Sequence, residues 1–259
     1  ELPDTKKIVA MVGARGCSAY GKKIAQELAY FLGKNGYVVI SGMARGIDAY
    51  AHIGCLQARA KTIAVLGCGV DVCYPAEHRR LYEQIISEGC VLSEYAPGSK
   101  PIARQFPPRN RIISGMARYV VVVEAKEKSG SLITTDFALE QGKDIYVVPG
   151  RMTDALSTGC NRLIAQGAGI ITSYEQFLQE IEETQLTDLT CGGAFTSNEI
   201  LLEKDELLVY SCFDFYPKSI EDVLQETGLE LLYLLSVIMQ LCDKGMLREC
   251  FKNQYIRMK

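Results

Sequence analysis

Cationic side chains are concentrated in one segment of this 259-residue chain. Between Tyr95 and Val123 there is no acidic residue, and the five cations are Lys100, Arg104, Arg109, Arg111 and Arg118. An arginine stands on each side of Asn110, directly after Phe106 and two prolines. A guanidinium can bind a phosphate through two parallel hydrogen bonds, and an aromatic ring can stack on a nucleobase. The segment favours a phosphate-bearing partner, unless Phe106 belongs to the core and one arginine forms an internal ion pair.

Three segments that follow expected strands are interpreted as turns, at Gly13–Lys23, Ser41–Asp48 and Phe106–Ala117. Glycine lets the backbone approach an anion closely, and the unpaired amides of a helix N-terminus point toward it. The first two turns each precede a helix and are expected to cradle phosphates. In the third, the proline pair fixes the path of the chain. The candidate anion contacts are Arg15, Ser18, Gly42, Arg45, Lys100, Arg104, Phe106, Arg109, Asn110 and Arg111.

A further anion site is expected after the strand predicted at Tyr119–Val123. Lys126 and Lys128 follow that strand, and Ser129-Gly130-Ser131 then opens a helix. Backbone amides exposed at such a turn bind anions by the same geometry as the earlier turns. Lys126, Ser129, Gly130 and Ser131 therefore join the candidate contacts.

Several catalytic and metal-dependent classes are disfavoured by the same residues. Gly16–Lys23 has the pattern G-x-x-x-x-G-K-K, so Lys23 replaces the Ser or Thr that would hold Mg²⁺ in a phosphate-binding loop. The dinucleotide fingerprint G-x-G-x-x-G is absent. His52 lies within an expected helix and His78 beside two arginines, and neither belongs to a nucleophile–base arrangement. We therefore expect binding rather than catalysis, with no cofactor.

Composition sets limits on the cellular setting. None of the ten cysteines forms a C-x-x-C pair, and only two histidines are present, so reduced thiols and no metal site are expected. No stretch approaches the roughly 20 apolar residues that span a bilayer, and the N-terminus lacks a signal-peptide pattern. We expect a cytoplasmic protein. Because residue 1 is Glu, we also expect a fragment of a longer protein or a processed form.

Short apolar runs alternate with amphipathic segments over the first two thirds of the chain. Strands are predicted at Ile8–Val12, Tyr37–Ile40, Thr62–Leu66, Cys90–Leu92, Tyr119–Val123, Ile145–Val148 and Gly169–Ile171. Helices are predicted at Lys22–Lys34, Ile47–Arg59, Glu77–Glu88, Leu132–Gln141, Gly159–Gln166 and Tyr174–Thr184. This alternation is typical of an α/β fold with a doubly wound, mostly parallel sheet, which binds ligands at the carboxyl ends of its strands.

The remainder of the chain differs in charge and pattern. Residues 1–173 contain 21 Lys and Arg against 15 Asp and Glu, whereas residues 174–259 contain 7 against 16. We predict a first domain at 1–185, a linker at 186–198 and a small domain at 199–259. Helices expected at Glu199–Tyr210, Ile220–Thr227 and Leu229–Asp243 and a hairpin at Met246–Arg257 outline a winged helix. Its last helix is so apolar, and the region so acidic, that a protein partner is favoured over duplex DNA.

Five segments of the chain occur in an order and spacing that resemble those of the DNA-processing protein A (DprA/Smf) family. They are GARGCSAYG, SGMARGIDAYAH, LGCGVDVCYP, FPPRNRIISG and SGSLITTDFALEQGKDIYVVPG, and the resemblance covers about Lys7–Glu182. It implies an extended Rossmann-like domain that binds and protects single-stranded DNA without sequence preference. It also implies a homodimer that hands DNA to the recombinase RecA in natural transformation and recombination, and a C-terminal winged helix.

The resemblance also assigns roles to residues. Arg15, Gly42, Phe106, Arg109 and Arg111 fall on motifs that form the DNA pocket of the family. The family often carries a lysine next to its Tyr-Pro motif, where this chain has Ala76. Arg79 or Lys100 could take over that contact.

A second family offers an alternative function. The fold is similar to that of nucleotide-processing enzymes marked by P-G-G-x-G-T-x-x-E, in which the glutamate assists N-glycosidic cleavage. Aligning Ser129-Gly130-Ser131 with P-G-G places Phe137 at the position of that glutamate. The alternative is therefore a nucleotide-binding or hydrolase-like protein of related fold.

Overall fold

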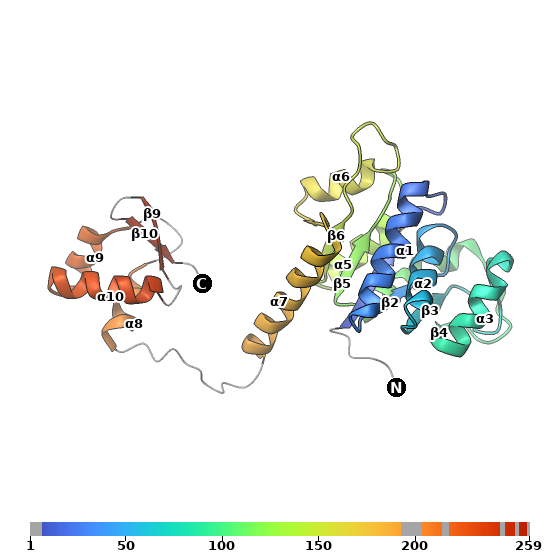
Figure 1. The fold of residues 1–259 in the computed structure, drawn as a ribbon, viewed down its shortest axis with the longest axis horizontal. Helices are drawn as coiled ribbons and strands as arrows, with labels where there is room; N and C mark the ends of the chain where they lie inside the picture. Colours follow the sequence, from blue (N-terminus) through green and yellow to red (C-terminus); the bar gives the residue numbers. More distant parts are fainter. Residues whose placement is uncertain (1–6, 193–203, 214–217, 244–246, 252–253, 258–259) are drawn as a thin grey trace. The chain divides into compact units, whose positions relative to one another are not determined.

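A computed structural model describes residues 7–192, 204–213, 218–243, 247–251 and 254–257 (Figure 1). The chain divides into two compact units, Glu1–Leu189 and Thr190–Lys259.

The first unit is built on a sheet of seven parallel strands. They are β1 (Ile8–Val12), β2 (Val38–Ser41), β3 (Thr62–Leu66), β4 (Cys90–Ser93), β5 (Tyr119–Val122), β6 (Asp144–Val147) and β7 (Gly169–Ile170). Their order is β4-β3-β2-β1-β5-β6-β7, so the chain winds outward from β1 in one direction and then outward from β5 in the other. The predicted doubly wound, Rossmann-like α/β fold is confirmed, with its switch point between β1 and β5.

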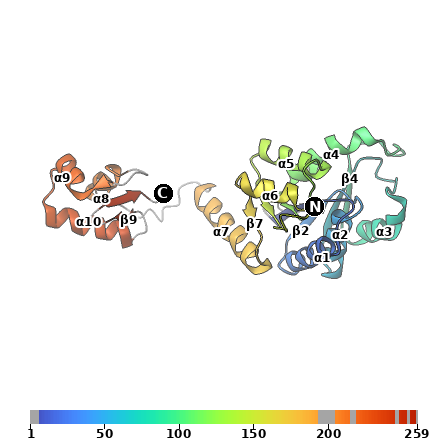
Figure 2. The same ribbon diagram turned by 90° about the horizontal axis from the view of Figure 1, so that it is seen from above.

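Helices cover both faces of this sheet. They are α1 (Ala19–Lys34), α2 (Ile47–Gln57), α3 (Arg79–Glu88), α4 (Phe106–Met116), α5 (Gly130–Glu140), α6 (Thr158–Ala165) and α7 (Tyr174–Gly192), with short 3₁₀ turns at Ala76–His78 and Ala103–Gln105. Figure 2 shows α1 and α2 on one side of the sheet and α4 and α5 on the other.

The central strands β1 and β5 are apolar and buried along their whole length because both of their faces are covered. Val9 and Met11 of β1 point into a cluster with α1, α2 and α7, whereas Ile8 and Ala10 point into a second cluster with α4, α5 and α6. Successive side chains of a strand alternate between its two faces, so a strand buried on both has no polar side.

The segment 106–117 corrects one prediction, because it forms helix α4 rather than a turn. Pro107 and Pro108 lie in the first turn of α4. The amides of a first helical turn have no intrahelical partner, so proline loses nothing there, and its fixed φ suits the helix. The buried Ile113 then anchors α4 on the sheet. As a result, Arg109, Asn110 and Arg111 belong to a helix.

The first residues of the predicted linker are helical. Helix α7 continues through Gly192, so residues 186–192 are helical, and residues 193–198 lie outside the described residues. Phe177 and Ile181 hold the first half of α7 in the core, and no Pro or Gly interrupts the sequence before Gly192. Threonines alone lower helix propensity only modestly.

The second unit contains helices and a small antiparallel sheet. Its elements are α8 (Lys204–Ser211), β8 (Lys218–Ser219), α9 (Ile220–Thr227), α10 (Leu231–Asp243), β9 (Leu247–Phe251) and β10 (Gln254–Arg257), with strand order β8-β10-β9. Val223, Leu234 and Ile238 are central members of its apolar core. Two predicted helices and the hairpin are present. The helix predicted from Glu199 has its first residues outside the described part, and the winged-helix assignment stays a prediction.

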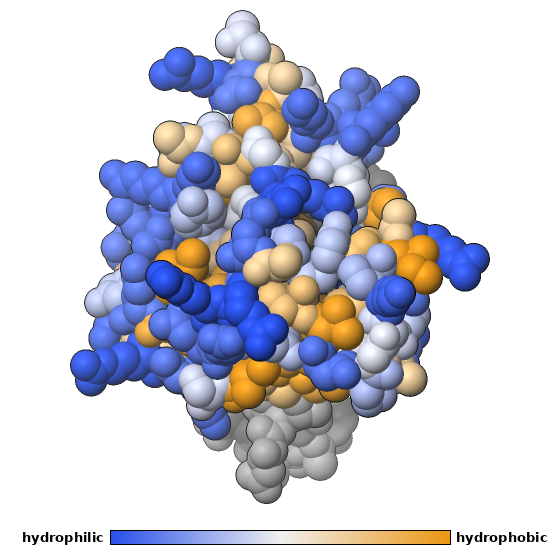
Figure 3. Space-filling model, turned by 90° about the vertical axis from the view of Figure 1, so that its right-hand side faces the viewer, coloured by the Kyte–Doolittle hydropathy of each residue, from blue (hydrophilic) through white to orange (hydrophobic). Residues whose placement is uncertain are grey.

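On the face seen in Figure 3, apolar residues lie in separate areas among hydrophilic ones. None of the helices in the described part of the chain combines the length and apolar character needed to cross a bilayer. The eight cysteines whose side chains are described are free thiols.

A strained residue after α2 yields a prediction for stability. Arg59 is exposed and has φ 56°, in the left-handed region that disfavours residues with a Cβ. Arg59→Gly should raise the free energy of unfolding by about 1 kcal/mol, seen as a higher urea midpoint. Arg59→Ala removes the same side chain but keeps the Cβ, so it should bring no gain. Equal midpoints for the two variants would show that the conformation carries no cost.

Candidate functional site

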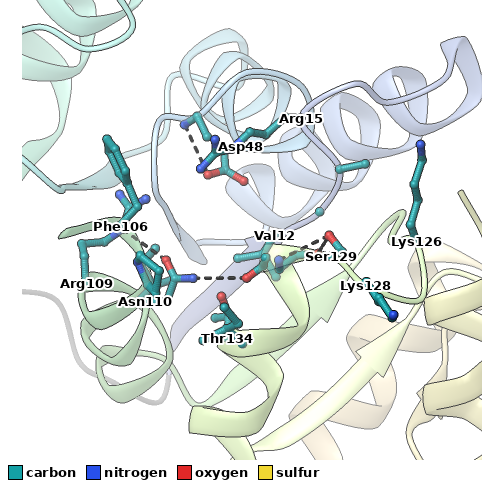
Figure 4. Close-up of a pocket in the computed structure, with 18 of the residues that line it drawn as sticks. Val12, Arg15, Asp48, Phe106, Arg109, Asn110, Lys126, Lys128, Ser129 and Thr134 are labelled. Carbon is teal, nitrogen blue, oxygen red and sulfur yellow. Dashed lines mark hydrogen bonds between the residues drawn. The ribbon is translucent and has the colours of Figure 1, made fainter. Parts of the chain in front are cut away.

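A cleft lies at the switch point, where the loops after β1 and β5 diverge to opposite sides of the sheet. Its volume is about 470 Å³. Its lining residues come from the loop after β1, the start of α2, α4, the loop after β5 and the start of α5, as Figure 4 shows. Open α/β sheets bind ligands at this crevice, because helices on the two sides leave it uncovered.

Eight of the fourteen predicted contacts line this cleft. They are Arg15, Phe106, Arg109, Asn110, Lys126, Ser129, Gly130 and Ser131. Gly42 and Arg45 line a small adjoining cavity of about 50 Å³ together with Arg15, Phe106 and Arg109. Ser18, Lys100, Arg104 and Arg111 line neither of these two cavities.

The guanidinium of Arg109 is buried and bonded to the backbone rather than open to a ligand. Arg109 is only 4% exposed. Its Nη1 donates to the carbonyl oxygen of Gly42 at 2.9 Å and to that of Val65, and its Nε donates to Oδ1 of Asn110 at 3.3 Å. A Cβ at Gly42 would lie 2.5 Å from Nη2, so only glycine fits there. Arg109 thus holds α4 against the ends of β2 and β3.

Asp48, in the first turn of α2, completes this buried group. Its Oδ2 accepts hydrogen bonds from the amides of Gly42, at 3.2 Å, and Ala44, at 3.3 Å. Burial raises the pKa of Asp48, and the positive charge of Arg109 and the two amides oppose that shift. Burial likewise lowers the pKa of Arg109, and Asp48 opposes it. The two charges compensate each other inside the protein, so little of the Arg109 charge is left for a ligand.

Three other cations supply the positive charge of the cleft. Arg15, Lys126 and Lys128 line it and are exposed. Within the described part of the chain, no ion pair engages any of the three. Lys126 and Lys128 extend from the loop after β5, across the cleft from Phe106 and Arg109 (Figure 4).

Two predicted contacts are paired with carboxylates instead. Arg45 donates to both oxygens of Glu77, at 2.7 and 2.8 Å, and Arg111 forms an ion pair with Glu94. All four side chains are substantially exposed. Exposed ion pairs contribute little to stability, so a phosphate could compete for either arginine.

The sequence left open whether Phe106 packs in the protein or faces a ligand. In the structure it does both, because it packs against other residues and also lines the cleft. Its ring stacks on Tyr74 with a centroid distance of 5.4 Å, and a Cβ at Gly67 would lie 2.7 Å from it. The guanidinium carbons of Arg15 and Arg109 lie 5.8 and 5.9 Å from the ring centre. These cation–π contacts position Arg15 at the cleft.

The start of α1 was expected to cradle a phosphate, but the carboxylate of Glu124 lies there instead. Glu124 is 2% exposed, and it accepts hydrogen bonds from the amide of Ser18, at 2.8 Å, and from the Ser18 hydroxyl. The Ser18 Oγ in turn caps the helix by accepting from the amide of Gly21. A helix N-terminus favours negative charge, and Glu124 at the end of β5 provides it. Ser18 is therefore a helix cap joined to Glu124.

The start of α5, by contrast, opens into the cleft. Its cap is Ser129, whose Oγ accepts from the amide of Ser131 at 3.4 Å, and no acid lies in its first turn. Asn110 of α4 donates to the carbonyl oxygen of Gly130 at 3.4 Å and so joins the two walls. The amides of Ser131 and Leu132 both donate to Ser129, so the Gly130 amide and the nearby lysines are the groups that can together bind an anion.

Sequence reasoning missed Tyr74, Asp48 and Thr134. Tyr74 occurs in the segment LGCGVDVCYP and supports Phe106, while Asp48 ends the segment SGMARGID and binds the amides of that turn. The sequence analysis singled out both segments, but it did not show which of their side chains point into the protein. Thr134 lines the cleft one turn into α5, and no sequence signal distinguishes it from its neighbour Thr135.

Fold and cleft together define the class: a doubly wound α/β protein with a crevice lined by basic residues at its switch point. Residues 2–182 match the family model of DNA recombination-mediator protein A, and the chain belongs to this family. The family resemblance inferred from the motifs is thereby confirmed.

Individual relatives agree with this assignment. DNA processing protein DprA of Streptococcus pneumoniae is 48% identical over 174 residues, which cover 67% of this chain and 61% of the relative, and that of Bacillus subtilis is 42% identical over 175 residues, which cover 68% and 59%. The X-ray structure of the S. pneumoniae protein superposes with a TM-score of 0.63 at 47% identity, covering 66% of this chain and 60% of that one. This chain therefore spans about three fifths of the length of these relatives.

A solved structure of DNA processing protein A from Helicobacter pylori also superposes with a TM-score of 0.63. It is 33% identical, and the match covers 71% of this chain and 82% of that one. Its description concerns a single-stranded DNA binding mode of that protein.

The contact between Gly21 and Glu124 yields a second stability prediction. A Cβ at Gly21 would collide with the Glu124 carboxylate, which two hydrogen bonds hold in place. Gly21→Ala should therefore lower the free energy of unfolding by about 1–3 kcal/mol, although alanine ordinarily stabilises a helix by roughly 1 kcal/mol over glycine. Urea denaturation measures it.

Gly16→Ala is the matched control, because no atom lies within 4 Å of a Cβ at Gly16. It should leave the midpoint nearly unchanged. If Gly21→Ala were more stable than the parent, the Glu124 carboxylate could not lie beside Gly21.

Proposed function

We propose that this chain binds single-stranded DNA without sequence preference in the cleft at its switch point. The observation that carries the proposal is the set of exposed cations Arg15, Lys126 and Lys128 around the open start of α5, which form no ion pair with any of the described residues. The description of the H. pylori relative supports the choice of ligand.

The concave shape favours a single strand over a duplex. A cleft of about 470 Å³ lies in the range of small-molecule pockets, and a flexible strand can place a phosphate and a splayed base in it. A duplex is instead recognised by a protruding helix or strand that enters a groove. Cations and backbone amides contact phosphates, which carry no sequence information, so binding is sequence-independent.

The roles of the lining residues follow from their surroundings. Arg15, Lys126 and Lys128 bind phosphates, together with the Gly130 amide at the start of α5. Arg109 shapes the site by holding the walls, as its burial and carbonyl partners indicate. Asn110 joins α4 to α5 in the same way.

The hydrolase alternative finds no support in the cleft. Asp48 is the one carboxylate among the described residues that line it, and it is committed to backbone amides and to Arg109. Phe137 stands where the related enzymes carry their glutamate and does not line the cleft. General acid–base catalysis needs a carboxyl group within reach of the reacting bond. We therefore propose binding without catalysis.

The wider role follows from the family. We propose that the protein protects single-stranded DNA in the cytoplasm, acts as a homodimer and hands the strand to a RecA-type recombinase. For the second unit we propose the winged-helix assignment and a protein partner. Leu231, Leu232 and Met239 of α10 support that partner, because Leu232 and Met239 remain 74% and 67% exposed.

Charge reversal tests the cleft. Arg15→Glu or Lys128→Glu should each weaken binding of a labelled oligothymidylate about 10- to 100-fold, since a charge-assisted hydrogen bond is worth about 1.5–3 kcal/mol. Fluorescence anisotropy measures it. Lys61→Glu makes a comparable charge reversal directly before β3, at the amino ends of the strands and so away from the cleft, and it should have little effect. Equal affinity of the cleft variants and Lys61→Glu would refute the site.

Salt dependence tests the nature of the contacts. About three phosphate contacts predict a slope of about −2 for log affinity against log salt concentration, at about −0.7 per phosphate on single strands. Lys128→Ala should make the slope shallower by about 0.7. Oligothymidylate and a mixed sequence should give the same slope. A slope near zero would contradict phosphate recognition.

A further inference from the structure

A second basic cleft adjoins the first and shares Arg15 and Gly16 with it. Its volume is about 520 Å³, and it lies among the starts of α1, α2 and α3. These helices stand in the order α1, α2, α3 in Figure 1. Among the described residues, four cations line it, and Glu77 is its one acidic residue. The cations are Arg15, Lys22, Arg45 and Arg80.

Two of these cations are available to a ligand. Lys22 on α1 and Arg80 on α3 are exposed, and no ion pair engages either of them among the described residues. The Nζ of Lys22 lies 5.6 Å from the ring centre of Tyr50, a half-buried side chain that lines the same cleft. A cation beside an aromatic ring is the combination that binds the phosphate and base of a single strand.

The boundary between the two clefts is formed by small residues and Arg15. A Cβ at Gly16 would meet no atom within 4 Å, so the backbone is open there. Gly46 has φ 75°, and a Cβ on it would collide with the carbonyl oxygen of Ala14. The turn before α2 therefore lies directly against the loop after β1. Arg15 is the only long side chain common to both linings.

We propose that a single strand held in the first cleft continues past Arg15 into the second, where Lys22 and Arg80 bind the next phosphates. This inference rests on the proposed function. A polynucleotide is the occupant that fits, because it carries one negative charge per nucleotide along a flexible chain. Two basic clefts joined at a shared arginine match such a repeating charge, and Tyr50 offers a stacking surface beside Lys22.

Glu77 limits the affinity of this second site. It pairs with Arg45 through two hydrogen bonds, and that pairing lowers its pKa, so it stays ionised. An incoming phosphate meets the negative charge of Glu77, while Arg45 is only partly available. Removing the Glu77 charge should therefore strengthen binding of strands long enough to reach the second cleft.

The test compares oligothymidylates from about 3 to about 16 nucleotides, a range that covers known site sizes. The double variant Lys22→Glu/Arg80→Glu in the full chain should weaken binding of the longest strand about tenfold or more and leave the shortest unchanged. The control Arg59→Glu/Lys61→Glu reverses one arginine and one lysine that line neither cleft, and should weaken neither strand.

Glu77→Gln is a second variant that cannot be mistaken for loss of folding. It should tighten binding of the longest strand about threefold or more and leave the shortest unchanged. If the parent binds the short strand but all variants bind the long strand equally, the second site is refuted while the first stands. If the parent binds no strand, the proposed function itself fails.

Discussion

The cleft depends on one buried charge. A guanidinium removed from water is costly unless its donors are bonded and its charge is balanced. Arg109 meets that requirement with the carbonyl oxygens of Gly42 and Val65 and with the nearby Asp48. These bonds tie α4 to the carboxyl ends of β2 and β3. The position of α4 in turn sets Phe106 and Asn110 on one side of the cleft, facing the loop after β5.

Charged residues around the switch point divide into two groups. One group is used within the protein: Glu124 binds the start of α1, and Asp48 and Arg109 balance each other. The other group, Arg15, Lys126 and Lys128, surrounds the open start of α5 without ion pairs in the described residues. Because Glu124 already occupies the start of α1, the proposed anion contacts lie at α5.

The strands were predictable because β-branched runs such as Tyr119–Val122 need burial on both faces, whatever their neighbours. Helix α4 was not, since a proline pair suggests a turn until its place in a first helical turn is known. The segments of the site were also predictable. The direction in which each arginine points was not predictable. Nothing in the sequence distinguishes Arg15 from Arg109, and Arg109 is buried because α4 packs against the ends of β2 and β3. The capture of Ser18 by Glu124 joins residues 106 positions apart.

A crystal structure of the chain with a short oligothymidylate would test the central claim most directly. We predict phosphates within hydrogen-bonding distance of the Arg15 guanidinium, the Lys126 and Lys128 ammonium groups and the Gly130 amide at the start of α5. Arg109 should keep its bonds to the carbonyl oxygens of Gly42 and Val65. A strand bound on another face, with the cleft at the switch point left empty, would contradict the account.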